Sequence, residues 1–414
     1  MSGRVLANGM PLVEMPVAGR LATAIAVVLP AGARHESSDE AGVAHLLEHL
    51  AFKGTENHRT ATELNRAAEY LGTELDGTST TDYVEFSTLV RAESAMPAIE
   101  LLGEVVGAPL LSEAELAVER EVILQEIADV NENPGSRADD LLIAALFAGH
   151  RLAKGIAGEA EDVQRLTHDR VLAFRDRQWS PAAGLVAIAG NLDHLDRTRL
   201  EALLGGIPER PPPPAPAAIP PFAPRRELEQ RDGDVVHLRL AYSVPGVDFK
   251  LRRDRAAAEV FSQLIGGPLG SRLFDELREQ HALCYWVDGH VWGYESATFL
   301  SVSCSVHPDN LAETYERIEA ILASLRAHGP TDEESRRFSA YSTGAVALDF
   351  ESASSRLEHA VELIMEYGDH DVDPILHLKE IEAITHSELT ELAAKIAPHP
   401  CIGCVGPAMA ADLA

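Results

Sequence analysis

The chain has 414 residues, of which 46% are hydrophobic, 24% charged and 5% aromatic, and these values exclude a disordered or fibrous chain and predict at least two globular domains. Acidic residues outnumber basic ones by 65 to 35, giving a formal net charge of −30, and no basic patch is visible, so a nucleic-acid partner is not expected. Cationic peptides and metal ions are the charged partners that fit, although such acidity also serves solubility alone.

The first half of the chain predicts strands alternating with helices. Apolar residues two apart indicate strands, and apolar residues three or four apart indicate helices. At Ser112 a serine is followed three residues later by a glutamate, which is typical of a helix N-terminus. The expected elements, in chain order, are Asn8–Val13, Ala22–Leu29, Ala41–Leu50, Ala61–Leu71, Tyr83–Val90, Ala95–Val106 and Ser112–Val130.

A proline-rich segment separates the two halves. Ile207–Arg226 contains the run PPPPAPAAIPP, which favours an extended, semi-rigid chain and excludes a helix or a central strand. We therefore expect an N-terminal domain over residues 1–206, a linker over 207–226 and a C-terminal domain over 227–414.

The second half repeats the order of the first. Its expected elements are Val235–Val244, Ala256–Leu264, Ser271–Gln280, Tyr285–His290, Thr298–Val306, Asp309–Ala327 and a helix that begins at Thr331. Strands that return after one or two helices predict an α+β domain, made twice, in which a mostly antiparallel sheet packs against helices. The alternative is that common strand–helix alternation imitates a duplication.

Neither a membrane span nor a disulfide framework is expected. No run of about 18 apolar residues occurs, and residues 1–14 lack the continuous apolar stretch of a secretion signal, so we predict a cytoplasmic protein. Four cysteines are too few for a disulfide scaffold. Cys401 and Cys404 form a CxxC pattern compatible with redox or zinc chemistry, but two small residues of a terminal strand explain it better.

The most informative segment is HLLEH, from His45 to His49. On a helix, His45 and His49 are four residues apart and share one face, so both imidazoles can bind one tetrahedral metal ion. Glu48 lies on the same side, where a carboxylate can take a proton from metal-bound water. This HxxEH order is the inverse of the HExxH zincin pattern and marks the inverzincins. The alternative is a pair of histidines on a solvated helix face.

A catalytic zinc ion usually has a third protein ligand. The acidic helix Ser112–Val130 offers candidates, namely Glu113, Glu115, Glu119, Glu121, Glu126 and Asp129. Glu119 and Glu126 are seven residues apart and share a face, so one could bind the metal while the other orients a ligand histidine. From the residues alone, a solvated acidic helix surface remains equally reasonable.

The segments GVAHLLEHLAFKGT and VEREVILQEI resemble the pitrilysin/insulinase-type zinc metallopeptidases, particularly the shorter branch that includes the mitochondrial processing peptidase. The resemblance covers almost the whole chain. It implies one zinc ion per chain, with Glu126 as the third ligand beside His45 and His49, Glu48 as the general base, and Glu119 as the residue that supports a ligand.

In the second half, GSRLFDELREQHALCYWV resembles the family segment that sends an arginine and a tyrosine to the zinc site. The matching residues are Arg278 and Tyr285, with Ala282 in place of the usual glycine. A phenol can donate to the oxyanion, and a guanidinium can hold substrate oxygens. The glycine-rich stretch from Ile265 to Gly270 resembles a family loop near the substrate.

The resemblance also implies that a peptide substrate adds a strand at Leu75, Asp76, Gly77 and Thr78, where Asp76 replaces the family asparagine. We thus expect an endopeptidase that acts on peptides, including basic ones, inside a chamber. A homodimer is expected, with a heteromeric partner as the alternative, and Arg278 and Tyr285 could act in their own chain or in the other. Two alternatives for the function are a non-catalytic subunit of the same fold and a dedicated leader-peptide maturation protease.

Overall fold

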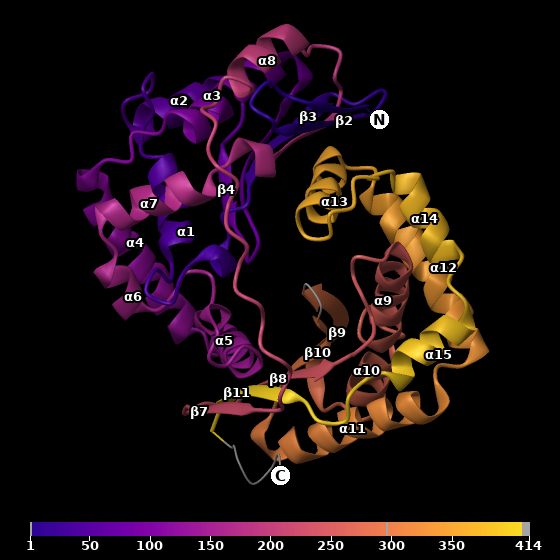
Figure 1. Cartoon of the computed structure of the whole chain (residues 1–414). Helices are drawn as coiled ribbons and strands as arrows, with labels where there is room; N and C mark the ends of the chain where they lie inside the picture. Colours follow the sequence, from indigo (N-terminus) through magenta and orange to yellow (C-terminus); the bar gives the residue numbers. More distant parts are fainter. Residues whose placement is uncertain (1, 295–296, 408–414) are drawn as a thin grey trace. The chain divides into compact units, whose positions relative to one another are not determined.

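The computed structural model describes residues 2–294 and 297–407, which form two compact units (Figure 1). The first unit comprises Met1–Ala128, Lys154–Ala218 and Asp349–Val372, and the second Asp129–Ala153, Ile219–Leu348 and Asp373–Ala414. Each unit is therefore assembled from separate stretches of sequence. The expected division at residues 1–206, 207–226 and 227–414 does not coincide with these units, although residues 205–225 form no helix or strand.

The first unit contains a six-stranded sheet in the order β1-β2-β6-β3-β5-β4. Only the β2–β6 pair is parallel. The strands are β1 (Ser2–Val5), β2 (Pro11–Pro16), β3 (Ala22–Leu29), β4 (Asp76–Ser79), β5 (Val84–Arg91) and β6 (Leu185–Gly190). The strand β4 closes one edge of this sheet.

The second unit contains a five-stranded sheet in the order β7-β11-β8-β10-β9, in which only β7 and β11 are parallel. Its strands are β7 (Arg226–Gln230), β8 (Val236–Ser243), β9 (Cys284–Tyr294), β10 (Ala297–Val306) and β11 (Cys401–Gly406). In the first sheet, β3 is followed along the chain by the edge strand β4 and then by β5, which lies between them. In the second sheet, β8 is followed in the same way by the edge strand β9 and then by β10. The prediction of a duplicated α+β domain with mostly antiparallel sheets is confirmed.

The helices of the first unit are α1 (Val43–Ala51), α2 (Ala61–Tyr70), α3 (Ala95–Gly107), α4 (Glu113–Glu132, of which the last turn belongs to the second unit), α6 (Ala160–Arg165), α7 (His168–Gln178), α8 (Arg197–Leu204) and α13 (Ala353–Met365). Those of the second are α5 (Pro134–Leu146), α9 (Arg252–Ile265), α10 (Arg272–Phe274), α11 (Leu311–His328), α12 (Asp332–Asp349), α14 (Pro374–Glu382) and α15 (His386–Ala394). Short 3-10 turns are Ala33–His35, Ala92–Ser94, Arg151–Lys154, Pro181–Ala183 and Pro308–Asn310. Within the parts of the chain so described, no helix has the length and apolar character needed to cross a bilayer.

Two expected helices differ from the structure for local reasons. The helix expected at Ala41 begins at Val43, because Gly42 has a φ of 87°, which is incompatible with a right-handed helix. The helix expected over Ser271–Gln280 is a short α10 followed by a π-helical turn over Asp275–Gln280.

Strand β3 is buried on both faces, and its alternation separates two cores. Ile25, Val27 and Leu29 pack into a core that includes residues of α1, α3 and α7. The intervening Ala24, Ala26 and Val28 face the other side, where they pack with Leu357, Val361 and Ile364 of α13. Since successive strand residues point to opposite faces, the small alanines let α13 approach this face closely.

The two halves of the sequence exchange one helix each. Helix α13 lies in the C-terminal half of the chain but packs on β3 and β6 of the first unit. Helix α5 follows α4 in the chain but packs on β8 and β11 of the second unit, where Figure 1 shows it in purple beside the yellow strand. This exchange is the reason why a single cut in the sequence cannot separate the units.

Strand β11 holds α5 through its smallest residue. A Cβ atom at Gly403 would lie 2.4 Å from both the carbonyl oxygen of Ala138 and the amide nitrogen of Leu142. Cys401 and Cys404 are buried, free thiols on the same strand. Residues three apart in a strand point to opposite faces, which favours the interpretation of this CxxC pattern as small strand residues.

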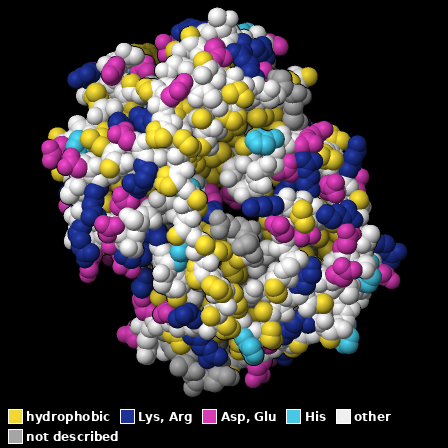
Figure 2. Space-filling view, in the orientation of Figure 1, with side chains coloured by type: hydrophobic (Ala, Val, Ile, Leu, Met, Phe, Trp, Pro, Cys, Tyr) yellow, Lys and Arg dark blue, Asp and Glu magenta, His cyan; other side chains and the backbone are white. Residues whose placement is uncertain are grey.

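Charged side chains are mixed over the face shown in Figure 2, where lysine and arginine alternate with aspartate and glutamate. On this face, acidic and basic side chains are therefore not separated into large areas of one charge.

We predict that Gly403→Ala destabilises the protein by about 1–3 kcal/mol, because the added methyl group overpacks a backbone contact. Gly344→Ala is the matched control in the same unit, since no heavy atom lies within 4 Å of its Cβ position and it sits inside α12. That substitution raises stability by roughly 0.5–1 kcal/mol through helix propensity. Thermal unfolding of the two variants measures both changes in stability. Equal Tm values would contradict the packing role of Gly403 against α5.

Candidate metal centre

Helix α1 presents both histidines because its other sides are held in the core. Val43, Leu46, Leu47 and Leu50 are all 1% exposed or less. The helix has no capping side chain at its own N-cap residue. Glu36 takes that role, accepting hydrogen bonds from the backbone amides of Gly42 at 3.0 Å and Ala44 at 2.8 Å.

The three predicted metal ligands come together in the first unit. The Nε2 atoms of His45 and His49 are 3.2 Å apart, and Glu126 Oε2 on α4 lies 3.9 Å and 3.8 Å from them. In a tetrahedral zinc site with bonds of about 2.0–2.2 Å, neighbouring ligand atoms are roughly 3.3–3.6 Å apart. The donor atoms therefore fit one such ion with small side-chain movements. Among the residues that the structure describes, His45, His49 and Glu126 are the only group of three or more side chains whose donor atoms lie close enough together to share one metal ion.

His45 is held in the form that binds metals. Burial, and secondarily the neighbouring His49, lowers the pKa of His45 to about 4, so its imidazole is neutral at neutral pH. A neutral imidazole keeps a lone pair for a metal, whereas a protonated one has none.

Glu119 lies behind His49, as the resemblance implies for a residue that supports a ligand. Its side chain is 3% exposed, and its Oε2 atom is 3.2 Å from Nδ1 of His49. Its other oxygen, Oε1, is 2.8 Å from the ammonium nitrogen of Lys53. The sequence reasoning missed Lys53, although its place four residues after His49 on the helical period is a signal that could have found it.

Glu48 is turned towards β4. Its Oε2 atom accepts a hydrogen bond of 2.8 Å from the hydroxyl of Ser79, the last residue of the strand predicted to receive substrate. A Cβ atom at Gly77 would lie 2.7 Å from Glu48 Oε1, so glycine is required where the strand passes this carboxylate. Burial raises the pKa of Glu48, and the Ser79 hydrogen bond opposes part of that effect. Burial therefore makes this carboxylate a stronger base.

The segment predicted to receive substrate is an edge strand beside Glu48. Strand β4 pairs with β5 and ends the sheet, so its other edge has backbone groups available to a further strand. Asp76, Gly77 and Thr78 belong to β4, and Leu75 precedes it and packs against the core. Their role in substrate binding stays a prediction.

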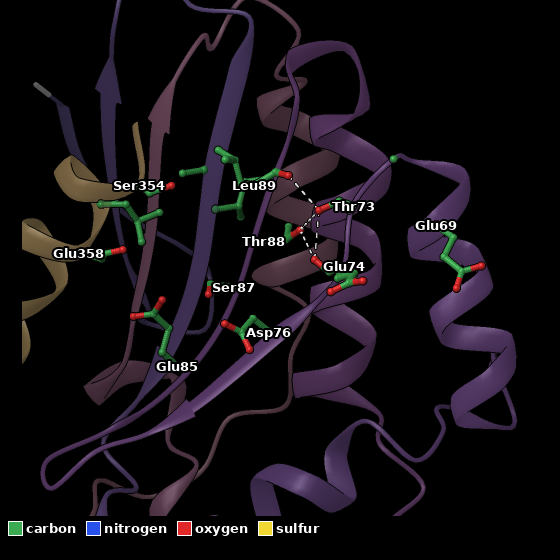
Figure 3. A pocket seen from close by; sticks show the side chains of 14 residues that line it. Glu69, Thr73, Glu74, Asp76, Glu85, Ser87, Thr88, Leu89, Ser354 and Glu358 are labelled. Atoms are coloured by element: carbon green, nitrogen blue, oxygen red, sulfur yellow. Dashed lines mark hydrogen bonds between the residues drawn. The ribbon is translucent and has the colours of Figure 1, made fainter. Parts of the chain in front are cut away.

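A pocket of about 650 Å³ adjoins the same strand on the α13 side of the sheet. Figure 3 shows Asp76 and Glu85 on the strands and Glu358 on α13, with Glu85 pointing towards Glu358. Glu69 and Glu74 complete the acidic lining, and the apolar part includes Leu89 and Leu357. The pocket thus combines five carboxylates with an apolar wall.

The carboxylates of this pocket influence one another. Burial is the main cause that raises the pKa of Glu85, and the charges of Glu358 and Asp76 raise it further, against a hydrogen bond from Ser87. A cation in the pocket would be attracted by all three acids, because each of them favours a positive neighbour.

Arg278 and Tyr285 belong to the second unit. The Arg278 guanidinium lies 4.8 Å from the ring centre of Tyr285 and 4.6 Å from that of Phe274, so the two predicted residues form one stacked group. Tyr285 is 83% exposed. Ala282 between them has a φ of 52°, the conformation that glycine adopts most easily, which matches the glycine expected there. Their action at the metal centre stays a prediction.

Within the glycine-rich stretch, at least one glycine has a packing role. A Cβ atom at Gly266 would lie 2.0 Å from the backbone nitrogen of Gly289 on β9. The end of α9 therefore touches β9 backbone to backbone, and a role of this stretch in substrate binding stays a prediction.

Two family profiles match this chain. Residues 19–160 match the insulinase family (Peptidase family M16), and residues 165–367 match the Peptidase M16 inactive domain. The residues His45, His49 and Glu126 all lie within the first match. The second match contains none of these three predicted ligands, which agrees with the name of that domain.

Relatives match this chain over most of its length. An uncharacterized zinc protease of Mycobacterium leprae is 29% identical over 94% of this chain and 87% of its own length. An uncharacterized zinc protease of Bacillus subtilis is 25% identical over 90% of each chain. A peptidase M16 inactive domain from Pseudomonas fluorescens has the same fold, with a TM-score of 0.85, 19% identity and coverage of 99% and 98%. A protease from Helicobacter pylori gives a TM-score of 0.83 at 20% identity and coverage of 98% and 99%.

We predict that Glu85→Gln stabilises the protein at high pH. A carboxyl whose pKa is raised by folding favours the protonated state, so stability is lost as the pH rises through that pKa. A neutral amide removes this loss. The Tm of the variant should exceed that of the wild type at pH 8, and the two should converge near pH 4, below the ordinary glutamate pKa of about 4.3. Glu69→Gln, on an exposed part of α2, should leave the Tm unchanged at both pH values, and a Glu85→Gln variant that is less stable at pH 8 would contradict the prediction.

Proposed function

Because the chain belongs to the insulinase family of peptidases (family M16), we propose that it is a zinc-dependent endopeptidase that hydrolyses peptides or unfolded segments. The observation that carries the proposal is the convergence of His45, His49 and Glu126, with Glu48 beside them. The relatives named zinc proteases support zinc as the metal. We propose one ion per chain, held by the one group of donors found among the described residues.

Each residue of the site has its own role in the proposed peptide hydrolysis. A zinc ion held by His45, His49 and Glu126 supplies Lewis acidity, which makes a water molecule more acidic and polarises the peptide carbonyl. Glu48 takes a proton from the attacking water as the new carbon–oxygen bond forms. It then delivers this proton to the amine nitrogen as the carbon–nitrogen bond breaks. The Ser79 hydroxyl holds Glu48 in place during both transfers.

The second unit contributes the stabilisation of developing charge in this proposal. The Tyr285 hydroxyl donates to the oxyanion, and the Arg278 guanidinium holds a substrate carbonyl or carboxylate. Their stacked arrangement and the exposure of Tyr285 support a role in binding a further molecule. Either the same chain or a second copy supplies them.

The substrate binds as an added strand on β4. Backbone pairing of this kind reads main chain more than side chain, which suits an enzyme for varied peptides. The position of Glu48 against Gly77 and Ser79 supports this geometry, because a peptide paired with β4 passes next to the general base.

The acidic pocket selects a cationic side chain of that peptide. A residue of the added strand that points to the α13 face of the sheet reaches Asp76, Glu85 and Glu358. The apolar wall accommodates the methylene groups of lysine or arginine, and the carboxylates receive the charged end.

The assembly and location complete the proposal. We propose a homodimer that encloses the substrate in a chamber, since this chain carries both the metal ligands and the arginine–tyrosine pair. The proposed location is the cytoplasm.

The decisive experiment is the substitution Glu48→Gln. We expect a loss of kcat of about 10²- to 10⁴-fold on a quenched peptide substrate, because the general base is removed while the ligands remain. The zinc content, measured by elemental analysis, should stay equal to that of the wild type. The matched control is Glu121→Gln, an exposed residue of α4, which should keep full activity. Full activity of Glu48→Gln would contradict the role of Glu48 as the general base. A wild-type protein without zinc and without activity would contradict the proposal as a whole and favour a non-catalytic subunit.

The choice of substrate is tested by Glu358→Gln. We expect the preference for a lysine-containing peptide over the same peptide with norleucine to fall by roughly tenfold, since one charge-assisted contact is worth about 1.4 kcal/mol here. The kcat/KM of the norleucine peptide should not change. An unaltered ratio would show that another surface reads the basic residue.

A further inference from the structure

Glu119 has one partner for each of its oxygens. Its Oε2 atom is 3.2 Å from Nδ1 of His49, and its Oε1 atom is 2.8 Å from Nζ of Lys53. The Glu119 side chain is 3% exposed, so water can offer few alternative hydrogen bonds to its carboxylate. The two contacts together fix the plane of the carboxylate, which neither contact does alone.

We propose that Lys53 is a positioning residue for the metal centre, and this inference rests on the zinc site of the proposed function. Its ammonium group holds Glu119 in the orientation that accepts the Nδ1–H of His49. Since the imidazole then donates from Nδ1, its Nε2 lone pair is directed to the side of His45 and Glu126.

Lys53 also explains why Glu126, and not Glu119, completes the ligand set. Both glutamates lie on one face of α4, seven residues apart. Both oxygens of Glu119 are engaged by Lys53 and His49, whereas Glu126 lies within 4 Å of both histidines through Oε2. The lysine therefore assigns different roles to two carboxylates of the same helix.

The backbone that carries Lys53 is held at both ends. On one side, its amide donates to the carbonyl of Leu50 at 3.1 Å, which ties it to the end of α1. On the other side, the carbonyl of Gly54 accepts from the amide of Leu110 at 2.9 Å. Gly54 has a φ of 142°, and a Cβ atom there would lie 2.6 Å from the carbonyl oxygen of Arg59. The loop geometry thus sets where the ammonium group can reach.

The loop after Lys53 is fastened to α3 through Glu104. This carboxylate accepts from the Thr55 hydroxyl at 2.7 Å and from the Asn57 amide at 3.0 Å, and it lies 2.9 Å from Nδ1 of His58. Three side chains of the loop therefore converge on one acidic residue. A loop held this firmly can position a flexible lysine.

The test measures zinc affinity in Lys53→Met, by competition with a chromogenic chelator. We expect a dissociation constant 10- to 100-fold higher than that of the wild type, as for other residues that orient a metal ligand. Lys53→Arg, which keeps a cationic donor, should restore the affinity to within about threefold. If Lys53→Met does not fold by circular dichroism, Lys53→Gln takes its place with the same expectation.

The matched control is Lys154→Met. Lys154 pairs with Asp162 at 2.6 Å, with side-chain exposures of 30% and 7% that resemble the 29% and 3% of Lys53 and Glu119. It lies in the same unit and contacts none of the predicted ligands among the described residues. Its loss should leave the zinc affinity unchanged.

A double substitution separates positioning from general destabilisation. In a Glu119→Gln background, Lys53→Met should weaken zinc binding no further, because the carboxylate that the lysine holds is gone. Unchanged affinity in Lys53→Met, an equal loss in Lys154→Met, or a further loss in the double variant would overturn the inference while the proposed function stands. A wild-type protein that binds no zinc would overturn both.

Discussion

The metal centre depends on the contact between α1 and α4, two helices of unlike character. Helix α1 is apolar and buried on most sides, whereas α4 is acidic and buries few residues, among them Leu116, Glu119 and Ile123. Ile123 is fully buried in the same core as Leu46 and Leu47, and it lies between Glu119 and Glu126. Apolar packing therefore draws this face of α4 onto α1, and the carboxylates are carried to the histidines with it.

The sequence predicted the parts of the site that short spacing determines. His45, Glu48 and His49 lie within two helical turns, so their common face follows from the helix period. The element order and the duplication were also predictable, since strand and helix periods are local properties. The spacing alone left open which of Glu119 and Glu126 binds the metal, and only the resemblance assigned the two roles. The contact of Lys53 with Glu119 is a tertiary one, which spacing does not predict.

The exchange of α5 and α13 could not be predicted from sequence for a related reason. The apolar stripe of an amphipathic helix indicates that one face is buried, but not which sheet packs against that face. Gly403 and the alanines of β3 are the residues that decide, since they allow α5 and α13 to approach β11 and β3. Small residues in a strand indicate that a helix can pack closely there, but they do not indicate which helix it is. The acidic pocket was missed in the same way, because Glu358 reaches Glu85 only through the docking of α13.

Of the two similar units, it is the first that contains the predicted metal ligands. Five strands of the first sheet, β2-β6-β3-β5-β4, have the same order as the second sheet, β7-β11-β8-β10-β9. However, His45, His49 and Glu126 lie in the first unit, while the helix that follows β8 contains no histidine. The first unit correspondingly holds buried or crowded acids at Glu48, Glu85 and Glu119, groups that folding alone would exclude. Burial raises the pKa of two of them, Glu48 and Glu85, so each carries a cost in stability when it is ionised. Among the residues that the structure describes, the buried acids are Glu14, Glu36, Glu48, Glu119 and Asp162, and all of them lie in the first unit. The cost of burying these charges is therefore carried by the unit that contains the predicted metal ligands.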